Sequence, residues 1–115
     1  GDECRLELIL HWQAEQRIET GYTVFVHLVG PDGQIWAQRD APPDNGAYPT
    51  SRWATEEVVA DPARVPLPTD LPGNVPLSVV VGMYHPDTGQ RVPVLDEQGQ
   101  PVDDKVVLGQ VVPEE

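Results

Sequence analysis

The sequence has only one cysteine, Cys4, among its 115 residues, so an intrachain disulfide is excluded. It has no apolar run approaching the ~18 residues of a membrane-spanning helix, and no basic segment followed by an apolar one as in signal peptides. We therefore expect no direct membrane insertion by this chain. It opens on Gly-Asp-Glu without a methionine, which indicates a fragment of a larger protein. The length fits a single domain, residues 1–115.

Basic residues are also scarce, with seven Lys and Arg against 19 Asp and Glu, which gives a net charge of −12. A field of this sign repels phosphate backbones and anionic membranes, so nucleic acid is not an expected partner. The acidic excess keeps the chain soluble in one interpretation and binds cations or polyols in another. The composition leaves both open.

No segment shows the 3.6-residue apolar period of a long helix, whereas turn formers are frequent, with 13 prolines and 10 glycines. Apolar and polar residues instead alternate with a period of two, which is typical of half-buried strands. The pattern predicts an all-β domain of about seven strands, an antiparallel β-sandwich of the immunoglobulin or fibronectin-III type, with a small jelly roll as the alternative. The predicted strands are 6–12, 22–29, 34–39, 57–65, 77–84, 91–95 and 105–112.

The alternation also predicts which side chains face the core. Within 34–39, Ile35 and Ala37 are expected to point inward, and Trp36 outward. Phe25 is expected on the polar face of its strand. The segment 40–52 has no strand character and is interpreted as a long loop, and one helical turn is expected near 13–17. The core is expected to contain Leu8, Leu10, Val24, Val26, Leu28, Leu77, Val79, Val81 and Met83.

Candidate catalytic and metal-binding residues form no recognisable pattern. The sequence has no G-x-S-x-G element, and neither serine, Ser51 or Ser78, has a histidine or an acid close to it in sequence. The three histidines, His11, His27 and His85, lack the spacing of zinc ligands. The acidic turns do not match the calcium-loop pattern. We therefore expect no catalytic residue, no metal and no cofactor, and a protein that is not an enzyme by itself.

Sugar binding without catalysis needs an exposed flat ring beside hydrogen-bonding groups. Trp36, flanked by Gln34 and Gln38, has this arrangement, as do Tyr48 and Trp53 at the long loop. In the alternative interpretation these rings cover the ends of the core, because tryptophan is on average highly buried. We expect Trp53 in particular to anchor the long loop rather than to bind a ligand.

Three segments resemble a known family in their order and spacing: YTVFVHLVGPDGQIWAQRDAPPDNGAYPTSRWATEEVV at 22–59, VPLPTDLPGN at 65–74 and VVVGMYHPDTGQRVPVLDEQG at 79–99. They resemble the soluble β-sandwich appended to large bacterial multi-spanning membrane proteins similar to glycosyltransferases of the dolichyl-phosphate-mannose protein mannosyltransferase type. The resemblance covers about 1–112 and carries no catalytic or ligand-binding residue with it. It implies an extracytoplasmic domain, periplasmic or at the cell surface, tethered to the membrane in the full-length protein.

Three functions follow as hypotheses. The first is a non-catalytic accessory or interaction domain whose partner is the rest of the parent membrane protein. The second is a carbohydrate-binding module that presents glycan through exposed aromatic side chains. The third is an independent hydrolase, which would need a cleft lined by carboxylates with perturbed pKa values.

Overall fold

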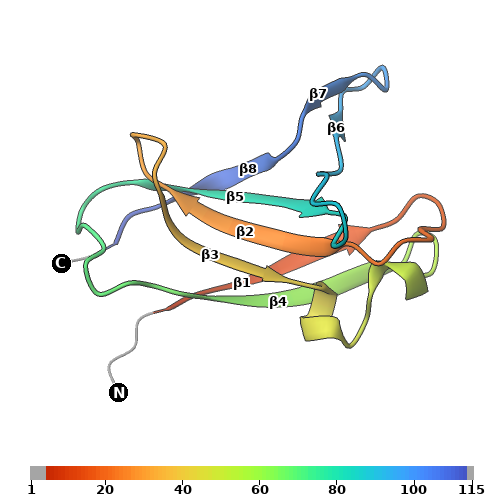
Figure 1. Cartoon of the computed structure of the whole chain (residues 1–115), viewed down its shortest axis with the longest axis horizontal. Coiled ribbons are helices and arrows are strands. Elements are labelled where there is room, and N and C mark those ends of the chain that lie inside the picture. The colour runs from red at the N-terminus through yellow and green to blue at the C-terminus, as the bar shows by residue number, and fades with distance from the viewer. Residues whose placement is uncertain (1–4, 114–115) are drawn as a thin grey trace.

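The computed structural model describes residues 5–113 and is all-β, as the alternation predicts (Figure 1). The single cysteine, Cys4, lies outside the described residues. The long predicted strands are confirmed to within a few residues, and the strand bounds differ mainly in the C-terminal part of the chain. The strands are β1 (Arg5–Gln13), β2 (Thr23–Val29), β3 (Ile35–Ala41), β4 (Val58–Pro66), β5 (Leu77–Tyr84), β6 (Val94–Leu95), β7 (Pro101–Asp103) and β8 (Val106–Val111).

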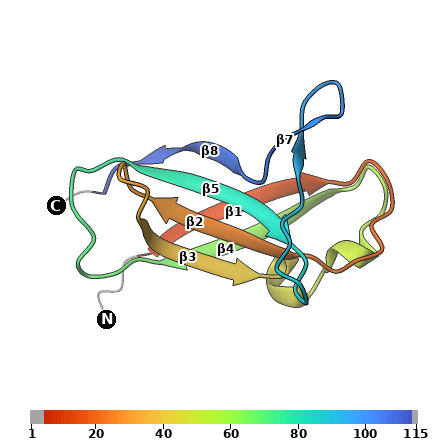
Figure 2. The same cartoon turned by 45° about the horizontal axis from the view of Figure 1, so that its top comes forward.

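The strands form two layers and a separate hairpin. Strands β3, β2, β5 and β8 make a four-stranded antiparallel sheet in that order, and β1 pairs with β4 in a two-stranded antiparallel sheet. Figure 2 shows the two-stranded sheet behind the four-stranded one, with β8 of the larger sheet lying beyond the edge of the smaller sheet. The β6–β7 hairpin stands away from both layers (Figure 1). The predicted antiparallel β-sandwich is confirmed.

The main core fills the space between the two sheets. Strands β2 and β5 contribute every second residue to it, because successive side chains of a strand point to opposite faces, and β1 and β4 supply the rest. Two residues expected in the core, Leu8 and Met83, are half-buried and pack against it rather than within it. The buried core residues are Leu10, Val24, Val26, Leu28, Ala63, Val65, Leu77, Val79 and Val81.

The prediction for the start of β3 is wrong at two positions. Ile35 is exposed, whereas Trp36 is half-buried and packs against the main core. The cause is a register shift at Leu28/Val29, where the partner residue in β3 moves from Ala37 to Ile35. A bulge of this kind adds one residue and reverses the expected faces locally.

The outer face of the four-stranded sheet is more covered than its polar sequence predicts. Phe25 lies on that face as expected, yet only 1% of its surface is exposed. Val80 on β5 is buried on the same face. The covering comes from the segment 85–105, which we call the arm. An ideal Cβ on Gly82 would lie 2.5 Å from the Phe25 ring, so the ring rests directly on this glycine.

The remaining differences from the prediction concern the expected helical turn and the strand at 91–95. The helical turn expected near 13–17 is absent from that segment, and the short 3-10 turns lie instead in the long loop, at η1 (Pro43–Gly46) and η2 (Thr50–Arg52). Strand 91–95 is reduced to Val94 and Leu95, which pair with the unpredicted β7. No helix within residues 5–113 is long and apolar enough to cross a membrane.

Candidate functional site

The residues considered as a possible sugar site do not form one aromatic platform. Trp36 packs against the main core, beside Gly30. Its neighbours Gln34 and Gln38 are exposed, and the Gln38 amide donates to Asp40 Oδ1 at 3.4 Å. The second candidate tryptophan, Trp53, belongs to another small cluster with Ala14 and Val59. The two indoles therefore serve different parts of the core.

Trp53 anchors the long loop, as expected. Only 3% of its surface is exposed, and its indole N–H donates to the Tyr48 carbonyl at 2.9 Å. Tyr48 is half-buried against the same cluster, and its hydroxyl donates to Glu57 Oε1 at 2.5 Å. This hydrogen bond is the main reason why the pKa of Tyr48 is raised.

Two buried polar side chains also fix the loop, and sequence reasoning missed both. Asp61 is fully buried on β4, where it accepts from the Trp12 indole N–H at 3.2 Å and from the Asp44 backbone N–H at 2.9 Å. Thr50 is fully buried as well; it donates to the Thr20 carbonyl at 2.6 Å and accepts from the Tyr22 N–H at 3.0 Å. A signal for Asp61 was present, because it stands at an inward position of its strand.

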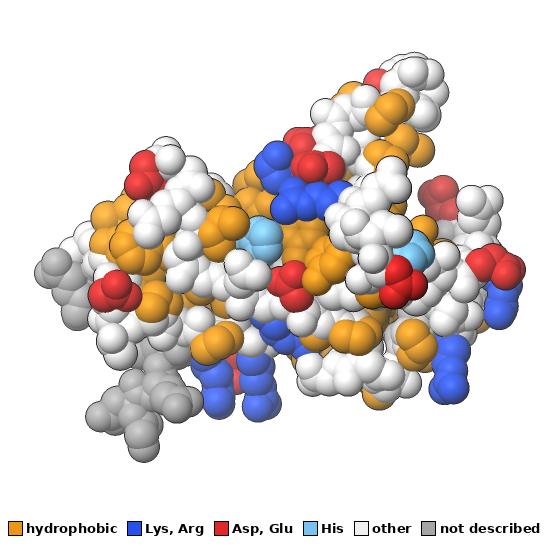
Figure 3. Space-filling model, viewed as in Figure 1, with side chains coloured by type: hydrophobic (Ala, Val, Ile, Leu, Met, Phe, Trp, Pro, Cys, Tyr) orange, Lys and Arg blue, Asp and Glu red, His pale blue; other side chains and the backbone are white. Residues whose placement is uncertain are grey.

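A polar cluster surrounds Phe25 at the base of the arm. The Arg91 guanidinium lies 4.3 Å above the Phe25 ring centroid, and its Nη1 is 3.4 Å from Asp104 Oδ1. The rings of His27 and Tyr84 lie 4.8 and 6.4 Å from that of Phe25. Figure 3 shows histidine, basic and acidic side chains gathered around apolar ones where the arm leaves the sheet. Arg91 therefore ties the arm to the sheet through a cation–π contact and an ion pair.

Asp40 connects this cluster to β3. It accepts from the Tyr84 hydroxyl at 2.8 Å, and its other oxygen is 4.0 Å from His27 Nε2. The Tyr84 pKa is raised, chiefly by that hydrogen bond. The His27 pKa is lowered, chiefly by burial and further by Arg91, while Asp40 acts in the opposite direction. These contacts fasten side chains to one another, and within residues 5–113 no three His, Cys, Asp or Glu side chains are grouped to hold a metal.

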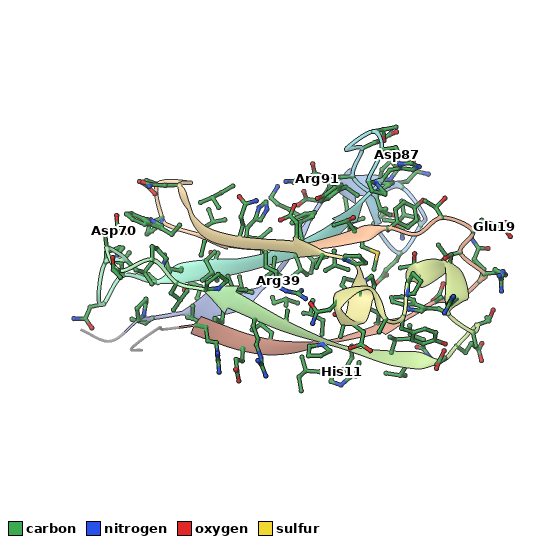
Figure 4. All side chains as sticks on the ribbon, turned by 60° about the horizontal axis from the view of Figure 1, so that its bottom comes forward. His11, Glu19, Arg39, Asp70, Asp87 and Arg91 are labelled. Atoms are coloured by element: carbon green, nitrogen blue, oxygen red, sulfur yellow. The ribbon has the colours of Figure 1, made fainter. Side chains whose placement is uncertain are left out.

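The two long sides of the sandwich differ in how their strand edges are protected. On one side, which we call the closed side, β3 and β4 contact each other and η1 packs against β4. The β4 edge carries Pro62 and Pro66, and Arg39 of β3 points into the space over β4 (Figure 4). Prolines and inward-pointing charges are known protections against edge-to-edge pairing.

The opposite side, which we call the open side, consists of the free edge of β1, strand β8 and the space between them. No strand within the described part of the chain pairs with the free edge of β1 or of β8. Strand β8 has neither a charge nor a proline, and its Val106, Val107 and Leu108 are exposed. Such a strand is a template for pairing with another chain.

A small apolar pocket of about 180 Å³ opens at one end of the open side. Its walls come from both sheets and from the segment after β4, with Arg5, Val112 and Pro113 at its margin. Exposed apolar surface that is continuous with a pocket is typical of an interaction site. The aliphatic lining residues are Leu6, Leu28, Leu67, Leu71, Leu77 and Val111.

Comparison with known proteins adds no identification: no protein-family model matches the chain, and no curated protein or solved structure shows significant similarity to it.

Proposed function

We propose that this chain is a non-catalytic interaction domain on the extracytoplasmic side of a membrane-bound, glycosyltransferase-like protein. Its partner is the rest of that parent protein, and it binds through the open side of the sandwich. The resemblance described for segments 22–59, 65–74 and 79–99 supports the choice of parent. The observation that carries the binding role is the contrast between the edges of β4 and β3, which carry prolines and an inward-pointing charge, and the uncharged, apolar β8.

The energetics of an exposed edge support this role. Natural sheets protect their edges because unpaired N–H and C=O groups recruit other chains, and β8 lacks the prolines and charges that the edges of β4 and β3 carry. Leu108 and Val107 remain 54% and 58% exposed beside those groups. A partner that covers them removes apolar surface from water and satisfies backbone hydrogen bonds at the same time.

The carbohydrate-binding alternative receives less support from the geometry. Trp53 is buried and Trp36 is half-buried against the core, so neither indole is a fully exposed platform for a sugar ring. Tyr48 is half-buried and hydrogen-bonded to Glu57. The exposed polar candidates that remain are Gln34 and Gln38.

The test is site-specific photo-crosslinking within the full-length membrane protein. A crosslinking residue at position 108 of β8 is expected to capture other parts of the parent protein. The same residue at position 58 of β4, where Val58 is also exposed (61%), is the matched control on the closed side and is expected to capture none. Equal capture at the two positions, or none at either, would overturn the proposal. Saturable binding of oligosaccharides to the domain would favour the carbohydrate alternative.

A further inference from the structure

The orientation of the backbone along β1 can be inferred from its partner strand. Pro62 and Pro66 of β4 stand opposite Ile9 and Arg5. A proline has no N–H to donate, so these are pairs in which both residues direct their backbone groups away from each other. Because the two classes of pair alternate, Glu7 and His11 belong to the same class as Ile9. The N–H and C=O groups of Glu7, Ile9 and His11 therefore point to the open side.

The space beside the free edge of β1, beneath the larger sheet, is wide enough for an additional strand. A four-stranded sheet exceeds a two-stranded one by two strand spacings, about 10 Å. Since β3 and β4 are in contact on the closed side, the excess width falls on the open side. There the inner face of β8 extends beyond β1, as Figure 2 shows. Val106 and Val111 occupy that inner face, because they pair with the inward-facing Val81 and Leu77.

A second copy of the domain does not fit this space through its own β1. Pairing two β1 strands about a twofold axis would place that axis next to β1, beneath the overhanging β8. The four-stranded sheets of the two copies would then occupy the same volume. A single extended segment has no such conflict. Its inward side chains would meet an aliphatic surface, and the pocket of about 180 Å³ would receive one of them.

We propose that the partner contributes one extended segment, which adds to the free edge of β1 as a strand beneath β8. Every second residue of this segment is apolar and faces Leu6, Val106 and Val111. Its outward residues stand beside Glu7, Ile9 and His11. The net charge of −12 attracts a segment that carries lysine or arginine. The inference rests on the interaction role proposed above and specifies the partner for the same surface.

The test uses a designed peptide as the probe. It has nine residues, the length of β1, with valine and threonine alternating and lysine at both ends. In hydrogen exchange followed by NMR, saturating peptide is expected to slow the amides of Glu7, Ile9 and His11 roughly tenfold or more. The amides of Leu8 and Leu10 already face β4 and are expected to change little. A peptide of the same composition with its valines grouped together, which cannot alternate, is the control.

Two variants separate strand addition from other ways of binding. Ile9→Pro removes a donor only from the free edge, at an exposed position opposite Pro62, so pairing with β4 is expected to persist. Val112→Lys places a charge at the margin of the pocket, where Val112 is exposed, and leaves the core intact. Each is expected to weaken peptide binding roughly tenfold, the equivalent of about 1.4 kcal/mol.

The outcomes distinguish this inference from the interaction role itself. If position 108 crosslinks to the parent protein while the peptide protects none of the three β1 amides, the interaction role stands and strand addition is wrong. Strand addition is also wrong if the peptide binds both variants as tightly as the original chain. Failure of crosslinking removes the interaction role, whatever the peptide does.

Discussion

The closed and open sides of the sandwich use opposite solutions at their strand edges. On the closed side, β4 has prolines opposite Arg5 and Ile9, β3 carries the inward-pointing Arg39, and the long loop packs against β4. On the open side, β8 is a run of aliphatic residues interrupted by Gly109 and Gln110, with no charge. Prolines and an inward-pointing charge are therefore confined to the closed side, whereas on the open side β1 carries Arg5 and Glu7 and β8 carries no charge. This difference distinguishes β8 as the apolar edge of the sandwich.

The largest effect is expected from the anchor of the loop that covers the closed side. Trp53→Ala should lower the free energy of unfolding by about 3 to 5 kcal/mol, because it leaves a cavity beside Ala14 and Val59. Urea unfolding monitored by circular dichroism measures this. Val58→Ala, at a neighbouring exposed position, is the control and should change stability by less than about 0.5 kcal/mol. An unchanged urea midpoint for Trp53→Ala would show that the loop does not depend on this ring.

A smaller loss is expected from the buried carboxylate on the same side. Asp61→Ala leaves the Trp12 indole N–H and the Asp44 N–H without their acceptor, which should lower the free energy of unfolding by about 2 to 4 kcal/mol. Asp61→Asn keeps one carbonyl oxygen and should recover part of this loss. Native-state hydrogen exchange of the Asp44 amide gives a local readout. If this amide exchanges no faster in Asp61→Ala, Asp61 does not hold the loop against β4.

The sequence predicts the sandwich well because its core follows a period of two over long runs. Val24, Val26 and Leu28 alternate without interruption, and so do Leu77, Val79 and Val81. The faces of Ile35 and Trp36 were predicted wrongly, because a bulge has no signature in the alternation. In the same way, nothing in the sequence around Phe25 indicates that a segment more than 60 positions later covers it.

The candidate surface was less predictable than the fold. The candidate sugar site was chosen for its tryptophans, Trp36 and Trp53, and both pack into hydrophobic clusters. The open side depends on which strand edges remain unpaired, and this follows from the order of strands in the sheets rather than from any single residue. The run 106–112 contains no Lys, Arg, Asp or Glu, but the longer run 71–86 contains none either, so this absence did not distinguish β8.

A still smaller effect concerns the cluster that ties the arm to the sheet. The pKa of His27 in the folded chain lies below its ordinary value of 6.5, mainly because of burial, and Arg91 lowers it further while Asp40 opposes. The unfolded chain therefore binds a proton more readily, so stability should fall as the pH decreases through about 6.5. The other neighbours of the imidazole, Gln38, Phe25 and Val80, have no titratable side chain.

Thermal unfolding between about pH 7.5 and pH 5.5 measures this dependence, and His27→Gln should flatten it. The loosening should be local. Amides of the arm should exchange faster at the lower pH, because a protonated imidazole repels Arg91, whereas those around Trp53 should change less. A slope that is equal in the His27→Gln variant would assign the pH dependence to other groups.

The smallest effect on stability is expected on the open side. There the two sides should differ in self-association rather than in the free energy of unfolding. Val107 is exposed on the outer face of β8, opposite Val80, so Val107→Lys should change the free energy of unfolding by less than about 0.5 kcal/mol. Two β8 strands can still meet edge to edge, because the overhang that blocks pairing through β1 does not shield β8 itself. A six-residue strand buries much less than the roughly 1,200 Å² of a stable interface, so this association should be weak and appear only at high concentration.

Sedimentation of the original chain should therefore show concentration-dependent association that Val107→Lys abolishes. Val58→Lys, which places the same charge on the protected β4, should leave it unchanged. Equal suppression by both variants would mean that added charge alone prevents association, and the distinction between the two sides would then have no consequence in solution.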